Sequence, residues 1–212
     1  TMKAGLLLVV IFLSRPLFAD PLSDARDHEK KSEFGKAAES YKVWLKENPS
    51  SPDFIPVLYR AADICPLPGD SLRILDDFLP LAPNPETAVG ILSKKAAFQE
   101  ITGDYTGAQA TLEQAYARSS GEEGLFFLAR SSELLMETGD LEKSEEQART
   151  VAARSADPRL KKRAVFQLAR VIAAKGDSGE AVRVASALTA DPANTAGNEA
   201  ILLFVFELAG SL

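Results

Sequence analysis

The chain has 212 residues, 24 of them Lys or Arg and 30 Asp or Glu, which gives a net charge of −6. Hydrophobic residues make up 46% and charged residues 25%, proportions typical of a globular protein and not of a disordered one. The acidic balance disfavours a dedicated nucleic-acid binder, one Cys excludes an intramolecular disulfide and a Cys-based zinc site, and one His excludes a two-histidine metal site.

The first segment, residues 1–19, has the parts of a secretory signal peptide. Met2-Lys3 gives a positive start, the run from Ala4 to Leu13 is apolar, and Ala19 precedes the polar Asp20. The apolar run is too short to cross a hydrocarbon core of roughly 30 Å. We therefore expect an exported protein, best suited to the bacterial periplasm, with no stable membrane span after cleavage. It is not expected to be a lipoprotein, because no Cys lies near Ala19. An uncleaved anchor and a buried helix are the alternatives.

The helices expected from residue 20 onwards begin with a short polar one. The segment 21–31 predicts either an N-terminal cap or a fraying end, and the next helix carries Phe34, Ala37, Tyr41 and Trp44. A further helix is expected to end near Cys65, because Pro66 and Pro68 cannot continue it.

Later helices differ in how clear their pattern is. The helix over 88–101 has Lys95 and Gln99 where apolar residues would be expected. The stripe of Val165, Leu168, Ala169 and Ile172 predicts a helix, and Ala181, Ala185 and Leu188 predict the next.

The dipeptide Gly-Asp recurs at 69–70, 103–104, 139–140 and 176–177, and Ser32-Glu33 opens a similar segment. Gly can adopt positive φ just past a helix end, and Asp can cap the next helix through its side-chain oxygen. Each dipeptide therefore predicts a tight turn between two helices. The spacing of 34 to 37 residues predicts a repeat architecture.

Residues at fixed distances from these turns support a repeat. Eight residues before the turn Asp, every repeat has a small residue, namely Ala62, Ala96, Ser132 and Ala169. Four residues after it come Ile74, Ala108, Ser144 and Ala181. Small residues that face one another let two antiparallel helices approach closely, while larger apolar residues fill the space between hairpins.

On these residues the chain resembles the tetratricopeptide repeat (TPR) family, most closely at Gly103-Asp104-Tyr105 and Gly139-Asp140-Leu141. The resemblance implies an all-α array of about five helical hairpins over residues 20–196, wound into a right-handed superhelix or α-solenoid. It further implies a non-catalytic protein-binding scaffold. A related helical repeat of another name remains open, because the motif is degenerate.

The last segment, residues 197–212, is expected to form an apolar helix that caps the array or starts a further repeat. Glu199 to Ala209 is apolar almost all round, although the end of a solenoid should have a polar outer face. This helix is either buried or meets a partner, and self-association through 199–209 is one form of the second alternative.

Residues that could carry catalysis are not assembled into a motif. His28 lies in a charged stretch and is interpreted as a solvent-facing residue, and Cys65 as a small buried hydrophobe. Adjacent carboxylates such as Glu145-Glu146 point in different directions on a helix. No nucleophile elbow, P-loop or dinucleotide fingerprint is present. We expect no catalytic site, no metal and no cofactor.

The resemblance implies a concave groove lined by the first helix of each hairpin. The positions that would face it carry basic and aromatic residues on an otherwise acidic protein: Tyr59, Arg60, Lys94, Phe126, Arg130, Arg163, Phe166 and Arg170. Arg binds carboxylates through paired hydrogen bonds. We therefore expect a protein or peptide partner with an acidic segment. The alternative is that these residues are ordinary solvated cations, offset by Asp63, Glu100, Glu133 and Glu137 on the same helices.

Two functional hypotheses follow. In the first, the chain is an interaction scaffold of the bacterial cell envelope that captures a partner segment in its groove. In the second, it is a structural or oligomerisation segment of a larger envelope protein, joined through the apolar C-terminal helix.

Overall fold

A computed structural model of the chain describes residues 20–189 and 198–210. The described residues form eleven α-helices and a short 3-10 helix, with no strand among them. The helices are α1 (Pro21–Lys30), α2 (Phe34–Glu47), α3 (Phe54–Asp63), α4 (Pro68–Phe78), α5 (Pro85–Ile101), α6 (Tyr105–Arg118), α7 (Gly121–Thr138), α8 (Leu141–Arg154), α9 (Pro158–Ala174), α10 (Ser178–Thr189) and α11 (Asn198–Ala209), and the 3-10 helix η1 (Leu79–Leu81) follows α4. The signal peptide expected over 1–19 lies outside the described residues.

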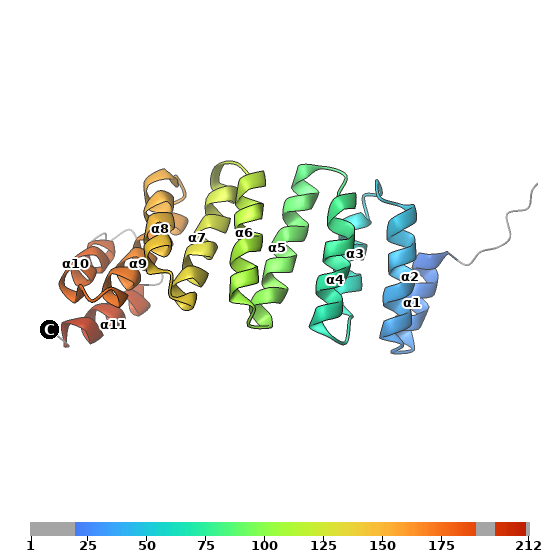
Figure 1. Cartoon of the computed structure of the whole chain (residues 1–212), viewed down its shortest axis with the longest axis horizontal. Helices are drawn as coiled ribbons and strands as arrows, with labels where there is room; N and C mark the ends of the chain where they lie inside the picture. Colours follow the sequence, from blue (N-terminus) through green and yellow to red (C-terminus); the bar gives the residue numbers. More distant parts are fainter. Residues whose placement is uncertain (1–19, 190–197, 211–212) are drawn as a thin grey trace, which may run out of the picture.

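Helices α1 to α10 form five hairpins that stack in chain order. Within each hairpin the two helices pack on each other, and the second helix packs on the first helix of the next hairpin. Figure 1 shows the result as one elongated row, with α1 and α2 at one end and α9 to α11 at the other. The expected all-α helix–turn–helix array is confirmed.

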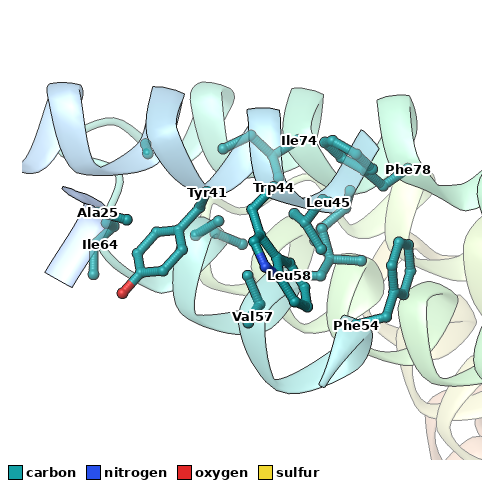
Figure 2. Close-up of a cluster of buried hydrophobic side chains, with 14 of the residues drawn as sticks. Ala25, Tyr41, Trp44, Leu45, Phe54, Val57, Leu58, Ile64, Ile74 and Phe78 are labelled. Carbon is teal, nitrogen blue, oxygen red and sulfur yellow. The ribbon is translucent and has the colours of Figure 1, made fainter. Parts of the chain in front are cut away.

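The core runs between neighbouring hairpins, as large apolar residues at repeat positions predict. At the N-terminal end Trp44 and Leu45 of α2 lie against Leu58 of α3 (Figure 2). Phe54 and Phe78 meet edge-on with ring centroids 6.3 Å apart, and both are fully buried. Burying one such side chain contributes roughly 1.5–3 kcal/mol, so the interface between hairpins is a main source of stability.

Three of the predicted Gly-Asp turns are confirmed. Gly103, Gly139 and Gly176 have φ of +78°, +89° and +95°. The aspartates that follow cap the next helix, since Asp104 Oδ1 accepts from the Gly107 amide at 3.0 Å and Asp140 Oδ1 from the Lys143 amide at 3.1 Å. These turns determine where the second helix begins in the third, fourth and fifth hairpins.

The turn predicted at Gly69-Asp70 is wrong. Helix α3 ends at Asp63, and α4 already begins at Pro68, so Gly69 and Asp70 lie in the first turn of α4. Pro is favoured at that first helical position, because its fixed φ suits a helix and its missing N–H would have no partner there. Gly69 does not have a positive φ. In the first hairpin Ser32 has the turn conformation, with φ of +58°.

The small residues predicted at the hairpin crossings are buried and face each other. The hydroxyl of Ser132 donates to the carbonyl of Ser144 at 2.8 Å, and the hydroxyl of Ser144 donates to the carbonyl of Ser132 at 2.7 Å. Gln99, which breaks the apolar pattern of α5, is also buried, and its amide oxygen accepts from the Thr111 hydroxyl at 2.7 Å. The buried amide of Gln99 therefore has a hydrogen-bond partner within the third hairpin.

Helix α11 has one buried side and one exposed side. Ile201 is buried, and Phe204 meets Phe166 of α9 edge-on at 5.4 Å. Leu202, Leu203 and Phe206 are 54%, 58% and 79% exposed. Among the described helices, none combines the length and hydropathy that a membrane span requires.

Candidate protein-interaction surface

We call the surface formed by the first helices of the five hairpins the first-helix face. These helices are α1, α3, α5, α7 and α9. All eight residues predicted for the groove lie on these helices: Tyr59 and Arg60 on α3, Lys94 on α5, Phe126 and Arg130 on α7, and Arg163, Phe166 and Arg170 on α9. Consecutive first helices are joined: α3 packs on α5 and α7 on α9, and ion pairs link α1 with α3 and α5 with α7. The surface is therefore continuous from one hairpin to the next.

Each basic side chain of this set pairs with a carboxylate on the preceding first helix. We call these pairs the ion-pair ladder: Glu29–Arg60 at 2.6 Å, Asp63–Lys94 at 2.7 Å, Glu100–Arg130, Glu133–Arg163 at 2.5 Å and Glu137–Arg170 at 3.7 Å. The partners are 30 to 33 residues apart in the sequence, close to one repeat. The cations are therefore largely neutralised, and they join one hairpin to the next.

The ladder is densest at Glu133, which binds two arginines. Its carboxylate accepts from Arg130 Nη1 at 2.7 Å and from Arg163 Nε at 2.5 Å and Nη2 at 2.7 Å. Burial opposes the charged form, but the hydrogen bonds from Arg163 and Arg130 outweigh it, and the pKa of Glu133 lies below its ordinary value. Hydrogen bonding to Glu100, followed by Glu133, in turn raises the pKa of Arg130.

At the first junction a tyrosine completes the pair. Glu29 accepts two bonds from Arg60 Nε, at 2.9 and 3.1 Å, one from Arg60 Nη2 at 2.6 Å and one from the Tyr41 hydroxyl at 2.7 Å. The hydrogen bond from Arg60 is the main reason why the pKa of Glu29 is lowered. Burial, followed by the hydrogen bond to Glu29, raises the pKa of Tyr41 to about 12.

Aromatic rings lie under two of the cations. Lys94 Nζ lies 5.4 Å from the ring centroids of both Tyr59 and Phe98, and the Arg163 guanidinium carbon lies 5.6 Å from that of Phe126. Such contacts contribute about 0.5–1 kcal/mol at exposed sites. Phe126 is still 48% exposed, so it is a large apolar group that the fold leaves facing solvent.

Phe166 differs from the rest of the set, and so does its neighbour Gln167, which lies ten residues before the turn Asp177, as Arg60, Lys94 and Arg130 lie before theirs. The ring of Phe166 packs against α11 through Phe204, and it belongs to the last core cluster. Gln167, which takes the ladder position in the repeat alignment, is buried and donates to the Ser132 carbonyl at 3.3 Å. Their positions stabilise the fifth hairpin, whereas the role predicted for Phe166 in partner binding stays a prediction.

A pocket at the α1–α3 junction was not predicted from the sequence. It has a volume of about 310 Å³ and is lined by Leu22, Arg26, Glu29, Tyr41, Pro56, Val57 and Arg60. A second open pocket of about 280 Å³ lies between α2 and α4, with Lys42, Arg73 and Asp77 among its lining residues. A sequence signal for the first pocket was the separation of 31 residues between Glu29 and Arg60, which is close to one repeat.

Residues with potential reactivity are engaged in ordinary contacts. The Cys65 thiol donates to the Ala61 carbonyl at 3.2 Å. Burial raises its pKa, so less of it is in the reactive thiolate form. His28 Nδ1 lies 2.6 Å from Glu33 Oε2 across the first turn. Within the described ranges no three His, Cys, Asp or Glu side chains are grouped as a metal site would require.

Comparison with known proteins shows similarity in fold. No protein-family model matches the chain, and no curated protein matches it in sequence. A tetratricopeptide repeat protein from Parabacteroides merdae aligns with a TM-score of 0.61 over 90% of this chain and 72% of that one, at 16% identity. TPR-like repeats of a kinesin light chain-like protein from Podospora anserina align at 0.55 over 80% and 92%, with 17% identity. The MamA protein aligns at 0.53 over 77% and 85%, with 18% identity.

The fold is therefore a TPR-like α-solenoid, as the resemblance implied. Stacked helical repeats of this kind form extended surfaces that can serve for binding.

Proposed function

We propose that the chain is a non-catalytic interaction scaffold of the bacterial cell envelope that binds a segment of a protein partner on its first-helix face. The observation that carries the proposal is the continuous row of first helices. On it the exposed ring of Phe126 lies among charged side chains that the ion-pair ladder holds in place. A surface whose side chains are already fixed loses little entropy on binding.

The ladder changes what the partner must provide. Because Glu29, Asp63, Glu100, Glu133 and Glu137 already neutralise the predicted cations, a strongly acidic segment would have to displace them. A partner with alternating charges and an apolar anchor fits this surface better. Electrostatic complementarity would then set register and specificity more than affinity.

The test uses a charge swap that preserves an ion pair. Asp63→Lys with Lys94→Asp reverses one rung on the first-helix face, where the pair is 2.7 Å apart. The matched control is Asp76→Lys with Lys95→Asp, which reverses the neighbouring pair between α4 and α5 at 2.5 Å. Both variants should remain helical by circular dichroism.

Affinity capture from envelope extract with residues 20–212 provides the measurement. We expect the wild type and the Asp76/Lys95 swap to bind the same specific partner, and the Asp63/Lys94 swap to lose it. Equal capture by all three would show that this part of the first-helix face is not used.

Export is proposed from residues 1–19 alone. Expression of the full chain in a bacterium with an outer membrane, followed by fractionation and N-terminal sequencing, should give a periplasmic product that begins near Asp20. A product that keeps Met2 and stays in the cytoplasm would contradict export.

A second function is favoured by α11. Leu202, Leu203 and Phe206 present three large apolar side chains to solvent, as an oligomerisation segment would require. Under this alternative, Leu203→Glu with Phe206→Glu reduces the mass measured by light scattering at micromolar concentration, and the Asp63/Lys94 swap does not. A wild type that is monomeric at these concentrations would reject self-association through α11.

A further inference from the structure

An open pocket between the second helices of the third and fourth hairpins has no part in the proposed function. Helices α6 and α8 both pack on α7, which lies between them (Figure 1). The pocket has a volume of about 380 Å³, within the range of small-ligand pockets, about 300–1,000 Å³. We call it the α6–α8 pocket, and its lining residues are Glu113, Tyr116, Leu128, Lys143, Glu146, Gln147 and Thr150. No residue of the ion-pair ladder lines it, so a ligand here would be separate from a partner on the first-helix face.

The carboxylates of this pocket are only partly used by the protein's own donors. Three donors share one oxygen of Glu113, since its Oε1 accepts from Gln109 Nε2 at 2.7 Å, from Gln147 Nε2 at 3.1 Å and from Lys143 Nζ at 2.6 Å. In the part of the chain that the structure describes, Glu113 Oε2 accepts no hydrogen bond and Glu146 makes no ion pair. The lining therefore has two carboxylates against one ammonium, a surplus of one negative charge.

Gln147 adds a buried acceptor that lacks a donor. The residue is 8% exposed, and its amide oxygen Oε1 is buried without a hydrogen-bond partner among the described residues. Exchanging the amide oxygen and nitrogen would place the oxygen against the Glu113 carboxylate, so the hydrogen bond to Glu113 determines the orientation. Buried polar groups are normally hydrogen-bonded, so an unpaired oxygen on a residue that lines a pocket points to a donor from outside the chain.

The apolar part of the pocket suits the stem and the plane of an arginine. It consists of Leu128 and the ring of Tyr116. Arg154, which is not a lining residue, already donates to the Tyr116 hydroxyl at 3.3 Å, so a guanidinium can reach this rim. A guanidinium has five N–H donors in one plane and stacks on aromatic rings, whereas an ammonium has three donors at one point. Separate acceptors beside an aromatic ring therefore favour arginine over lysine.

We propose that the α6–α8 pocket binds an arginine side chain of a basic protein segment. The guanidinium donates to Glu113 Oε2, to the Glu146 carboxylate and to Gln147 Oε1, and the alkyl stem packs on Tyr116 and Leu128. Because the pocket is open, a side chain can enter it while the main chain of the segment stays outside. The net charge of −6 favours the encounter with a basic segment. The inference goes beyond the proposed function, because it adds a second binding site away from the first-helix face.

The test follows the amide signals of the ¹⁵N-labelled full chain by NMR during titration with four probes. The first is N-acetyl-arginine methylamide, and the second is its citrulline counterpart, which keeps the shape and lacks the charge. The third is the lysine counterpart, and the fourth is spermidine, a free polyamine. We expect the arginine probe to bind about tenfold more tightly than the citrulline probe, because charge-assisted hydrogen bonds are the stronger class. The largest shifts should include the side-chain amide of Gln147.

Two substitutions with opposite expected effects tie the result to the pocket. Glu146→Gln removes an unpaired carboxylate, so it should weaken binding of the arginine probe about twofold to fivefold. Lys143→Gln removes the ammonium of the lining, so it should strengthen binding by a similar factor. Glu47→Gln is the matched control, because Glu47 is exposed on another second helix, α2, and does not line the pocket. It should have no effect.

The proposal is overturned if the arginine probe shifts no signal of the pocket at millimolar concentration, or if Glu146→Gln behaves like Glu47→Gln. It is also overturned if the citrulline, lysine or spermidine probe binds as tightly as the arginine probe, and tighter binding of spermidine would assign the pocket to free polyamines. Its failure is distinguishable from that of the scaffold function. If the probes fail while the Asp63/Lys94 swap still abolishes partner capture, the scaffold stands and only the α6–α8 pocket is rejected.

Discussion

At the scale of single residues, the structure changes what the predicted binding residues do. Arg130 contacts Glu100 and Glu133, so its replacement would leave Glu100 without its partner and remove one of the two arginines that bind Glu133. A loss of binding after Arg130→Glu would therefore mix a lost contact with altered stability. Variants that preserve the pair are therefore the informative ones.

Gly69 and Gly139 are both followed by Asp, but replacing them by alanine should change the stability of the fold in opposite directions. Gly139 has φ of +89°, so Gly139→Ala should destabilise by about 1 kcal/mol or more. Gly69 lies within α4, and a Cβ there would meet nothing within 4 Å, so Gly69→Ala should be neutral or stabilise by up to about 1 kcal/mol. Urea midpoints measure both, and equal effects would contradict the assignment of Gly69 to the helix.

Glu133 should contribute stability that depends on pH. Its folded-state pKa is lowered, so the contribution is fully present above the unfolded pKa of about 4.5 and is lost as the pH falls through the lower folded value. Glu133→Gln should cost about 1 kcal/mol at pH 7, and the difference from wild type should shrink below pH 4.

Glu47→Gln is the control for this pH dependence, because Glu47 is exposed at the end of α2. It should change stability by no more than about 0.5 kcal/mol at either pH. A cost for Glu133→Gln that stays constant from pH 7 to pH 3 would show that the loss is one of packing and not of charge.

At the scale of elements, the third, fourth and fifth hairpins depend on small residues where their helices cross. In the fourth hairpin Ser132 and Ser144 are both fully buried and exchange hydrogen bonds with each other's carbonyls. The third and fifth hairpins use alanines at the same positions, Ala96 with Ala108 and Ala169 with Ala181, and these are also buried. The close approach of the two helices leaves no room for a longer side chain.

Ser144→Leu should therefore destabilise by about 1–3 kcal/mol through overpacking. Ser144→Ala keeps the size and removes one hydrogen bond, so it should cost about 1 kcal/mol. Thermal unfolding of the two variants gives the comparison. If leucine is tolerated as well as alanine, the α7–α8 crossing is looser than the structure indicates.

The hairpins were largely predictable because their signals are local. The positive φ at Gly139 and the capping by Asp140 depend only on the residues of one turn. The small residues Ser132 and Ser144 lie within the same hairpin, close to that turn in sequence. Gly69-Asp70 has the same two residues but forms no such turn, because α4 begins at Pro68, three residues earlier than the other turns would place it. Gln99 broke the apolar pattern of α5, yet Thr111 satisfies it from the next helix, which no single-helix pattern can reveal.

The candidate site was predictable only in part. Sequence placed Arg60, Lys94 and Arg130 on first helices, because repeat alignment preserves helix faces. Their carboxylate partners lie on the preceding hairpin, and a pattern within one helix cannot identify them. The recurring separation of 30 to 33 residues was present in the sequence and would have indicated the ladder. That Tyr41 and Arg60 share Glu29 depends on the packing of three helices, which a pattern within one helix cannot show.

At the scale of the whole molecule, the stacked hairpins present two different long surfaces. The first-helix face carries the ion-pair ladder, the exposed ring of Phe126 and the α1–α3 pocket. The second helices also carry exposed apolar groups, namely Phe34 and Val43 on α2 and Tyr105 on α6, and Val43 is as exposed as Phe126, at 47% against 48%. This pair of residues allows the two surfaces to be compared with side chains of equal accessibility.

The central claim is that the partner binds the first-helix face, and position-resolved photo-crosslinking tests it most directly. A benzophenone amino acid would replace Phe126 in one variant and Val43 in the other, and each full chain would be irradiated in cells of the same host. We predict a discrete crosslinked partner from position 126 and none from position 43. Crosslinks of the same partner from both positions, or from position 43 alone, would contradict the assignment.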